Sequence, residues 1–284
     1  MKYLVLVNPS SNGGNAGKRW QSLAAKMPEA DFVPLKSIEE ANTLARTASG
    51  YETIVACGGD GTINAVADGV MSNPDTALRF GVIYMGTSPD FCRFHNIPTD
   101  TDEAIRLLRE AHCKKVPVLQ ANGHCFFCSC NLGMGADIAS LANRIRPFLG
   151  DKLGTFLAVI RNLLRNRKWN LCINGEYIQN CNHFLITRIP HIASGLKISL
   201  PPLENDAYAI WYVRNLSFFG WLRLIPKLYK GQPCGELRLV KGPSTITSET
   251  AVNVEFDGDP HGELPLQISF SPRKLRLITK SSTD

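Results

Sequence analysis

The stretch that decides the fold is Ile54-Val55-Ala56-Cys57-Gly58-Gly59-Asp60-Gly61-Thr62-Ile63-Asn64. Its apolar start is typical of a buried strand, and its three glycines let the backbone approach a ligand closely. A helix that begins next would turn free N–H groups and a positive dipole end toward an anion such as phosphate. Asp60 adds like charge there, so its carboxylate suits a position near Mg²⁺ or the task of accepting a hydroxyl proton. The alternative interpretation is a tight strand–helix turn capped by Asp60.

Strand and helix patterns alternate around this stretch over the first 117 residues. Apolar runs that end in turn residues predict buried strands, and the segments between them predict helices. Strands joined by helices form a parallel sheet with right-handed crossovers, so we expect an α/β domain at 1–117. The predicted strands are Tyr3–Val7, Phe32–Leu35, Thr53–Ala56 and Phe80–Tyr84, and the predicted helices are 16–27, 37–48, 63–71 and 100–111.

The pattern changes after residue 117, where short strand-like stretches predominate. They predict a second, mainly antiparallel β domain at 118–272, with helical insertions at 137–167, which contains breaks, and at 216–230. The apolar segment Leu275–Ile278 lies in a tail, 273–284, that we expect to return to the first domain. The predicted strands of the second domain are Cys125–Asn131, Trp169–Ile173, His183–Arg188, Tyr208–Val213 and Val252–Phe256.

Two further polar loops follow strands of the first domain. They are Asn8-Pro9-Ser10-Ser11-Asn12-Gly13-Gly14 and Gly86-Thr87-Ser88-Pro89-Asp90-Phe91. Because open α/β sheets bind ligands beyond the carboxyl ends of their strands, the three loops together predict a phosphate-binding site. The site is not a P-loop, since the Gly-Lys-Ser/Thr ending is missing, and its glycine spacing does not fit the dinucleotide fingerprint.

The composition of the 284 residues narrows the class of partner. A net charge of +6 favours anionic partners such as nucleotide phosphates, acidic lipid headgroups or nucleic acid. We find no nucleic-acid motif and no basic stripe with interleaved aromatics, so we expect no nucleic-acid partner. The apolar runs are too short for a membrane span or a signal peptide, and nine scattered cysteines fit reduced thiols in a cytoplasmic protein.

Five motifs in order resemble the diacylglycerol kinase catalytic domain superfamily, which includes soluble bacterial diacylglycerol-kinase-like lipid kinases and the sphingosine and ceramide kinases. The three loops resemble its Asn-Pro-x-Ser-Gly, Gly-Gly-Asp-Gly-Thr and Gly-Thr-x-Asn-Asp-Phe motifs. The segment 194–208 resembles the family stretch that ends in Asp-Asp-Gly, and 256–260 resembles its Asp-Gly-Glu-Pro motif. The sequence departs from these patterns at Ala65, Pro89, Ala207 and Asp259, where many members have Glu, Asn, Gly and Glu.

The resemblance implies that 1–117 is an α/β nucleotide-binding domain and that 118–272 is a β-sandwich-like domain. It implies an ATP-dependent lipid kinase that transfers the γ-phosphoryl group to the hydroxyl of a diacylglycerol or sphingoid-like lipid, as part of phospholipid metabolism. It also implies a lipid substrate at the membrane surface, reached by peripheral contact from the cytoplasmic side. A homodimer stays open. The implied ATP contacts are Asn8, Pro9, Ser10, Ser11, Asn12, Gly59, Asp60, Gly61, Thr62, Ile63, Asn64 and Thr87.

The resemblance also implies the groups that would carry the chemistry. Asp60 lies where Mg²⁺ would bridge the phosphates, and Asp257 or Asp259 would accept the hydroxyl proton, with Asp259 at the position of the family's proposed general base. A second Mg²⁺ would be bound in the second domain. Its implied ligands are the side chain of Asp206 and the backbone oxygens of Leu203 and Tyr208.

Other interpretations stay open at this point. The Asp-Gly-Asp at 257–259 is also typical of a plain hairpin turn. An NAD kinase-like enzyme would share the Gly-Gly-Asp-Gly-Thr element, and the four departures favour a nucleotide-binding regulator without turnover. The apolar and basic segment Leu216–Lys230 predicts either a helix packed on its own domain, which Pro226 interrupts, or a helix on an anionic membrane. The basic segment 144–169 is interpreted as a solvated helix end.

Overall fold

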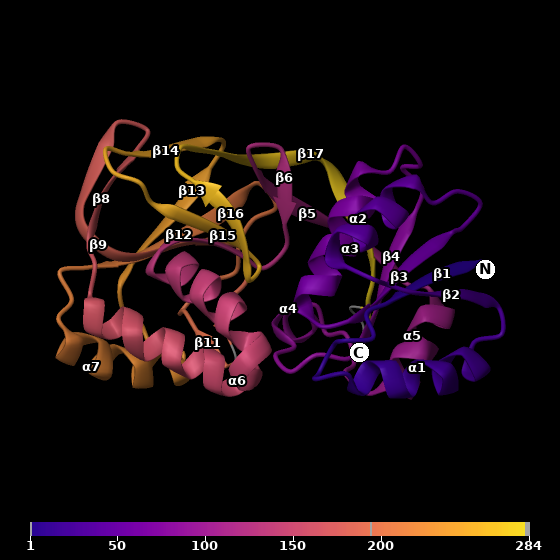
Figure 1. The fold of residues 1–284 in the computed structure, drawn as a ribbon. Helices are drawn as coiled ribbons and strands as arrows, with labels where there is room; N and C mark the ends of the chain where they lie inside the picture. The colour runs from indigo at the N-terminus through magenta and orange to yellow at the C-terminus, as the bar shows by residue number, and fades with distance from the viewer. Residues whose placement is uncertain (1, 194, 282–284) are drawn as a thin grey trace. The chain divides into compact units, whose positions relative to one another are not determined.

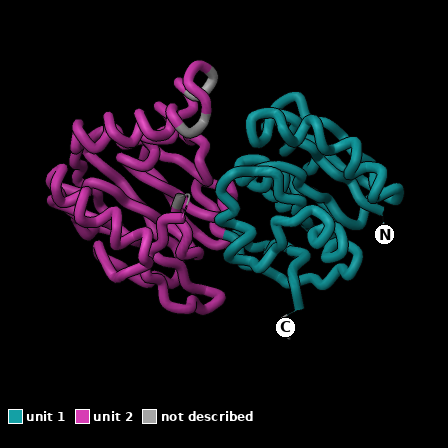
Figure 2. Tube along the Cα trace, turned by 90° about the horizontal axis from the view of Figure 1, so that it is seen from below, with its two compact units in different colours: residues 1–118, 271–284 teal, residues 119–270 magenta. Residues whose placement is uncertain are grey.

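The structure is a computed structural model that describes residues 2–193 and 195–281. The chain divides into two compact units (Figure 2). Unit 1 comprises Met1–Val118 and Ser271–Asp284, and unit 2 comprises Leu119–Phe270. The chain passes from one unit to the other within two strands, β5 (Cys113–Ala121) and β17 (Leu266–Ile278).

Unit 1 is built on a parallel sheet with the strand order β17-β4-β3-β1-β2 (Figure 1). Its central strand β3 (Thr53–Gly58) is buried along its whole length, as expected for a strand covered on both faces. Pairing aligns Val55 with Val5 on one side and with Gly81 on the other. The other elements are β1 (Tyr3–Val7), β2 (Ala30–Pro34), β4 (Arg79–Tyr84), α1 (Asn15–Lys26), α2 (Ile38–Thr47), α3 (Asp60–Ser72), α4 (Asp90–Phe94) and α5 (Thr101–Glu110).

The helices of unit 1 begin in two different ways. The side chain of Ser37 accepts a hydrogen bond from the Glu40 N–H at the start of α2, and Asp100 caps α5 in the same manner. Helix α3 follows Gly59 and, within the described part of the chain, no side chain caps it. The first N–H groups of α3 are therefore available to a ligand.

Unit 2 is mainly antiparallel, which confirms the predicted fold class of two dissimilar domains. Strand β9 (Glu176–Thr187) lies between β7 (Ser129–Gly133) and β12 (Ala207–Arg214), so that Phe184 pairs with Leu132 on one side and with Tyr212 on the other. The other strands are β6 (His124–Phe126), β8 (Trp169–Ile173), β10 (His191–Ala193), β11 (Leu196–Lys197), β13 (Glu236–Lys241), β14 (Ser244–Ser248), β15 (Asn253–Phe256) and β16 (Asp259–Glu263), and the helices are α6 (Met134–Arg165) and α7 (Phe218–Tyr229).

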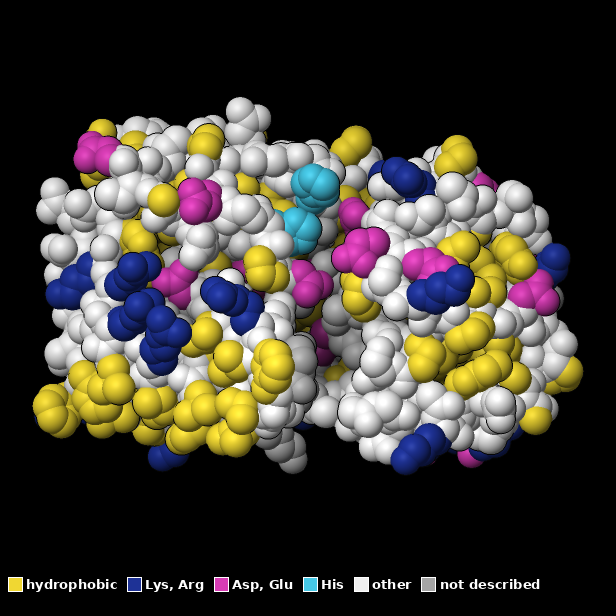
Figure 3. All heavy atoms as spheres, in the orientation of Figure 1, with side chains coloured by type: hydrophobic (Ala, Val, Ile, Leu, Met, Phe, Trp, Pro, Cys, Tyr) yellow, Lys and Arg dark blue, Asp and Glu magenta, His cyan; other side chains and the backbone are white. Residues whose placement is uncertain are grey.

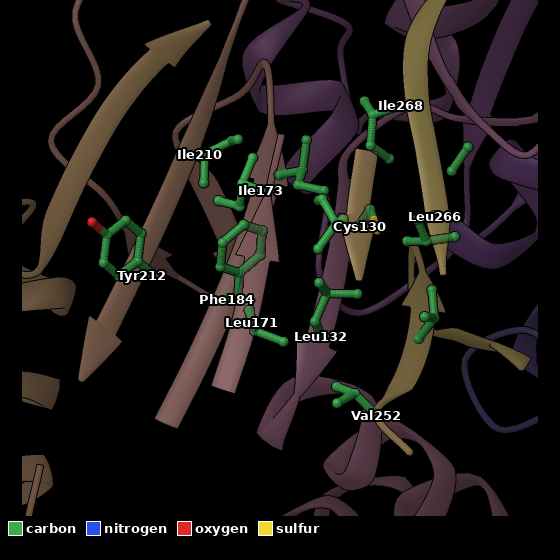
Figure 4. Close-up of a cluster of buried hydrophobic side chains, with 14 of the residues drawn as sticks. Cys130, Leu132, Leu171, Ile173, Phe184, Ile210, Tyr212, Val252, Leu266 and Ile268 are labelled. Atoms are coloured by element: carbon green, nitrogen blue, oxygen red, sulfur yellow. The ribbon is translucent and has the colours of Figure 1, made fainter. Parts of the chain in front are cut away.

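A buried apolar cluster holds unit 2 together (Figure 4). Alternate residues of β7, Cys130 and Leu132, contribute to it, and their exposed fractions are 0% and 1%. Phe184 contributes from β9 and stacks on Tyr212 at 6.0 Å between ring centroids. Among the described residues, none of the helices has the length and hydropathy needed to span a bilayer.

The structure differs from the predicted elements in several places. The expected strand Cys125–Asn131 is two strands, β6 and β7, separated by a turn. The expected helix near 63 already begins at Asp60. A break within 137–167 was expected, and it falls at Gly150 (φ 74°, ψ 170°), which divides α6 into two arms. Helix α7 instead continues through Pro226, where an interruption was expected.

Candidate active site

The three glycine-rich and polar loops of unit 1 are tied together at the carboxyl ends of β1, β3 and β4. The Asn8 N–H donates to the Cys57 carbonyl at 2.9 Å, and the Asn8 Nδ2 donates to the Thr62 hydroxyl at 2.9 Å. The Met85 N–H donates to the Gly58 carbonyl at 2.8 Å. The structure therefore brings the three predicted phosphate loops into one place.

Close backbone approach explains two of the glycines in these loops. A Cβ atom on Gly86 would lie 2.7 Å from the Gly59 Cα, and one on Gly58 would lie 2.5 Å from the Thr62 hydroxyl. The second and third loops can therefore meet at Gly59 and Gly86 only because position 86 carries no side chain, and a side chain at position 58 would displace Thr62. The Gly59 N–H also donates to the Ser11 hydroxyl at 3.3 Å, which adds a contact between the first two loops.

The first turn of α3 has the features of an anion-binding site. The helix N-terminus lacks a side-chain cap, and the Asn64 Oδ1 atom is buried without a hydrogen-bond donor among the described residues. Buried polar atoms are nearly always paired, so an acceptor of this kind points to a bound group that donates to it. Thr62 is 1% exposed and Asp60 is half-buried beside it.

Asp60 lies close enough to two buried groups to affect their ionisation. Burial raises the pKa of the Tyr84 phenol and of the Cys92 thiol, and the negative charge of Asp60 raises both further. Both groups therefore stay neutral at physiological pH, and Asp90 also raises the pKa of Tyr84. The third loop contains exposed Thr87 and ends at Asp90, whose carboxylate accepts the Ser88 hydroxyl at 3.1 Å.

The acidic residues of unit 2 surround the β15–β16 hairpin. Glu255 of β15 is only 4% exposed and pairs across the sheet with Asn131 of β7, whose Nδ2 donates to the Glu255 carboxylate at 2.7 Å. The Gly258 N–H donates to the same carboxylate. Burial raises the pKa of Glu255 to about 8, and the charges of Asp257 and Asp259 add to this effect. The sequence interpretation did not single out Glu255.

Asp257 closes the turn between β6 and β7. Its carboxylate accepts the N–H groups of Phe127 at 2.7 Å, Cys128 at 2.8 Å and Ser129 at 2.7 Å. Burial raises the pKa of Asp257 to about 6, although these three N–H donors lower it. Asp257 itself lies in the tight turn between β15 and β16, where its backbone is left-handed (φ 50°).

Asp259 is the first residue of β16 and pairs with Phe256 across the hairpin. Its side chain is half-buried. The hairpin-turn interpretation of Asp257–Gly258–Asp259 is thus correct as a description of the backbone. Three acidic residues, Glu255, Asp257 and Asp259, fall within the five residues 255–259 around this turn.

The predicted metal loop of unit 2 precedes β12. Asp206 is exposed and its carboxylate lies 3.7 Å from the Lys241 Nζ. Arg188 donates to the carbonyls of Glu204 at 3.2 Å and Asn205 at 3.4 Å, and also to that of Ala207. No three His, Cys, Asp or Glu side chains converge as metal ligands within residues 2–193 and 195–281. One carboxylate with backbone oxygens nonetheless fits a hard cation such as Mg²⁺.

Comparison with known proteins identifies the domain. A family model described as the diacylglycerol kinase catalytic domain matches residues 2–121. Diacylglycerol kinases of Staphylococcus saprophyticus and Staphylococcus carnosus are each 28% identical to this chain over 92% of it, and the matches cover 90% and 89% of those proteins. A crystal structure of a diacylglycerol kinase from Bacillus anthracis has a TM-score of 0.78 at 22% identity, covering 100% of this chain and 98% of that one, which supports the fold alone. The resemblance to the superfamily is confirmed, and it is residues 2–121 that match the diacylglycerol kinase catalytic domain.

Proposed function

We propose that this chain, with its diacylglycerol kinase catalytic domain, is an ATP-dependent lipid kinase that phosphorylates the hydroxyl of a diacylglycerol or sphingoid-like lipid. The observation that carries the proposal is the uncapped N-terminus of α3, which begins at Asp60 where three phosphate-loop segments meet. Phosphoryl transfer depends mainly on positioning and on neutralising charge, and this arrangement is suited to both.

Unit 1 would hold the nucleotide. The N–H groups of the first turn of α3 and the Ser11 and Thr62 hydroxyls would bind phosphate oxygens, as in other helix N-terminal sites. Mg²⁺ would neutralise phosphate charge, with the Asp60 carboxylate as its protein ligand. The remaining proposed ATP contacts are Asn8, Pro9, Ser10, Asn12, Gly59, Gly61, Ile63, Asn64 and Thr87.

Unit 2 would supply the proton acceptor, and the geometry favours Asp259 over Asp257. The oxygens of Asp257 already accept three backbone N–H groups, so Asp257 serves as an anchor for the β6–β7 turn. Asp259 would take the proton from the lipid hydroxyl as the oxygen attacks the γ-phosphorus. Glu255 is a positioning residue in this proposal, because it holds the N–H of Gly258, the residue before Asp259.

A second Mg²⁺ would be held by the Asp206 carboxylate and the backbone oxygens of Leu203 and Tyr208, where it would steady the loop that precedes β12. The proposed setting of the reaction is the cytoplasmic face of the membrane, within phospholipid metabolism, because the acceptor is a lipid. Peripheral contact and a homodimer are both compatible with this setting.

The experiment that tests the function needs no prior choice of lipid. The protein is incubated with labelled ATP, Mg²⁺ and a total lipid extract, and the labelled product is identified by mass spectrometry. We expect a phosphorylated lipid with the wild type and none with Asp60→Ala. Binding of MgATP in calorimetry without any labelled product from lipids or NAD would overturn the kinase proposal.

A further inference from the structure

Large apolar side chains are exposed on two helices of unit 2. On α6, Phe148 is 85% exposed and Leu164 67%, and on α7 Phe219 is 69% exposed. A folded protein rarely leaves such a group of side chains in water without an interaction that uses it. We define the α6–α7 surface by its exposed apolar residues, which are Phe148, Leu149, Leu153, Phe156, Leu157, Leu164, Phe219, Leu222 and Tyr229.

The two helices lie together, so their exposed faces form one region. Leu163 of α6 packs in the same buried cluster as Trp221 and Leu228 of α7. The Asn166 Nδ2 after α6 donates to the Leu216 carbonyl before α7 at 2.9 Å. Figure 3 shows hydrophobic side chains gathered over these helices, at the edge of unit 2 where Figure 1 places α6 and α7.

A groove runs between the two arms into which Gly150 divides α6. Its volume is about 610 Å³. Each arm contributes one aliphatic stripe at helical spacing, so most of the lining is apolar. The aliphatic residues that line it are Leu141, Ile145, Leu149, Leu157, Ile160 and Leu164, and Arg161 and Arg165 complete the lining.

The charged side chains in the two stretches of sequence that contribute to this surface are all positive. The sequence contains no Asp or Glu from 153 to 168 or from 207 to 235. Both stretches carry basic side chains, and Figure 3 shows Lys and Arg gathered beside the apolar region. The exposed basic residues of these stretches include Arg161, Arg165, Lys168, Arg223, Lys227 and Lys230.

We propose that the α6–α7 surface docks on an anionic lipid bilayer, with its apolar side chains in the acyl region and the α6 groove filled by lipid hydrocarbon. Apolar insertion together with basic side chains is the combination by which helices bind anionic membranes. A second copy of this chain is a poorer occupant, because it would bring a matching set of positive charges to the same interface. The inference rests on the proposed function, because an enzyme with a lipid acceptor must reach that acceptor at the bilayer.

The test measures binding of the whole protein to sedimenting vesicles without ATP. Wild type is expected to bind vesicles that contain phosphatidylglycerol more tightly than vesicles of phosphatidylcholine alone. Phe148→Ser/Phe156→Ser and Arg161→Glu/Arg165→Glu should each lower the partition coefficient by at least about tenfold. Raising the salt concentration should weaken the wild type and have less effect on the charge variant.

Matched controls change equally exposed side chains elsewhere. Tyr177 is 65% and Leu239 53% exposed on other strands of unit 2, and Tyr177→Ser/Leu239→Ser should leave binding within about twofold of wild type. Lys114→Glu/Lys115→Glu, at exposed positions of β5, is the control for charge. Circular dichroism confirms the fold of every variant, and Phe219→Ser replaces any α6 variant that fails to fold.

Two results would overturn the inference. One is vesicle binding that the surface variants and the controls affect equally. The other is a dimer in sedimentation equilibrium that Phe148→Ser/Phe156→Ser dissociates while vesicle binding persists, since the occupant would then be a second copy. Because no step of this test uses ATP or turnover, its outcome is independent of whether the kinase proposal holds.

Discussion

The carboxylate of Glu255 accepts the N–H of Gly258 three residues further on, and so fixes the turn that leads to Asp259. The same carboxylate is held by Asn131 on the neighbouring strand. A buried glutamate thus connects the sheet of unit 2 to the hairpin that would present the proton acceptor. The first prediction concerns its ionisation.

The stability of the protein should fall as pH rises toward 8. The folded protein keeps the Glu255 proton up to about pH 8, whereas an unfolded chain releases it near the ordinary value of 4.5. The folded state therefore binds more protons in this window, and the free energy of unfolding decreases with pH by about 2–4 kcal/mol. Glu255→Gln should remove the decrease between pH 6 and 8 in thermal melts and make the decrease below pH 6 smaller. The part that remains below pH 6 comes from Asp257, whose pKa burial raises to about 6.

Asp60→Ala should abolish ATP-dependent phosphorylation without unfolding the protein. Asp60 is half-buried at the first position of α3 and would be the protein ligand of the Mg²⁺ that accompanies ATP. Loss of such a charge should lower kcat at least about a hundredfold. Glu110→Gln, at an exposed position at the end of α5, serves as the control. Retention of more than about a tenth of the wild-type rate would remove Asp60 from the mechanism.

Asp259→Glu should be tolerated far better than Asp259→Asn. Glutamate keeps a proton acceptor and restores the residue that many family members have at this position, whereas asparagine accepts no proton. We expect Asp259→Glu to retain kcat within about tenfold of wild type and Asp259→Asn to lose about a hundredfold or more. Equal losses in the two variants would show that Asp259 is not the base.

Asp257→Asn should act mainly on stability. Three backbone N–H groups lose a charged acceptor, and the amide nitrogen of asparagine meets one of them as a second donor. The expected loss is about 2 kcal/mol in the free energy of unfolding, measured by urea denaturation. Glu263→Gln, exposed on β16, should change little. A stable variant without activity would instead assign Asp257 to the chemistry.

Arg188→Ala should make the loop before β12 more dependent on Mg²⁺. In the wild type the Arg188 guanidinium already binds three carbonyls of this loop, so millimolar Mg²⁺ should raise the melting temperature only slightly. In Arg188→Ala those carbonyls lose their cation, and we expect a lower melting temperature that Mg²⁺ partly restores. The response should disappear when Asp206→Asn is added. A Mg²⁺ response that is the same in wild type and Arg188→Ala would contradict this account.

Much of unit 1 was predictable from the sequence because local signals and tertiary structure agree there. Strand β3 is buried on both faces, so its sequence is a continuous apolar run, which differs clearly from the pattern of an amphipathic strand or helix. The three polar loops follow strands of one parallel sheet, so their common place at the carboxyl ends of those strands was predictable, and the close approach of Gly86 to Gly59 agrees with it.

Unit 2 was less predictable because its decisive contacts are distant in sequence. Alternation along Val252–Phe256 correctly puts Val254 and Phe256 in the core, yet it gives no sign that Glu255 on the opposite face is also covered. The turn that separates β6 from β7 depends on Asp257, about 130 residues away. The apolar residues of α6 have helical spacing whether they face a core or solvent, so exposure of the groove could not be inferred from periodicity.

The passage of β17 from unit 2 into unit 1 has a consequence for synthesis of the chain. Strand β17 pairs in parallel with β4 at Leu277 and Phe80, and Leu275, Leu277 and Ile278 are buried there. During translation the amino-terminal sheet keeps an open edge while the whole of 119–270 is being made. The ribosome therefore delivers unit 1 unfinished, and its final strand is added only after unit 2 has emerged.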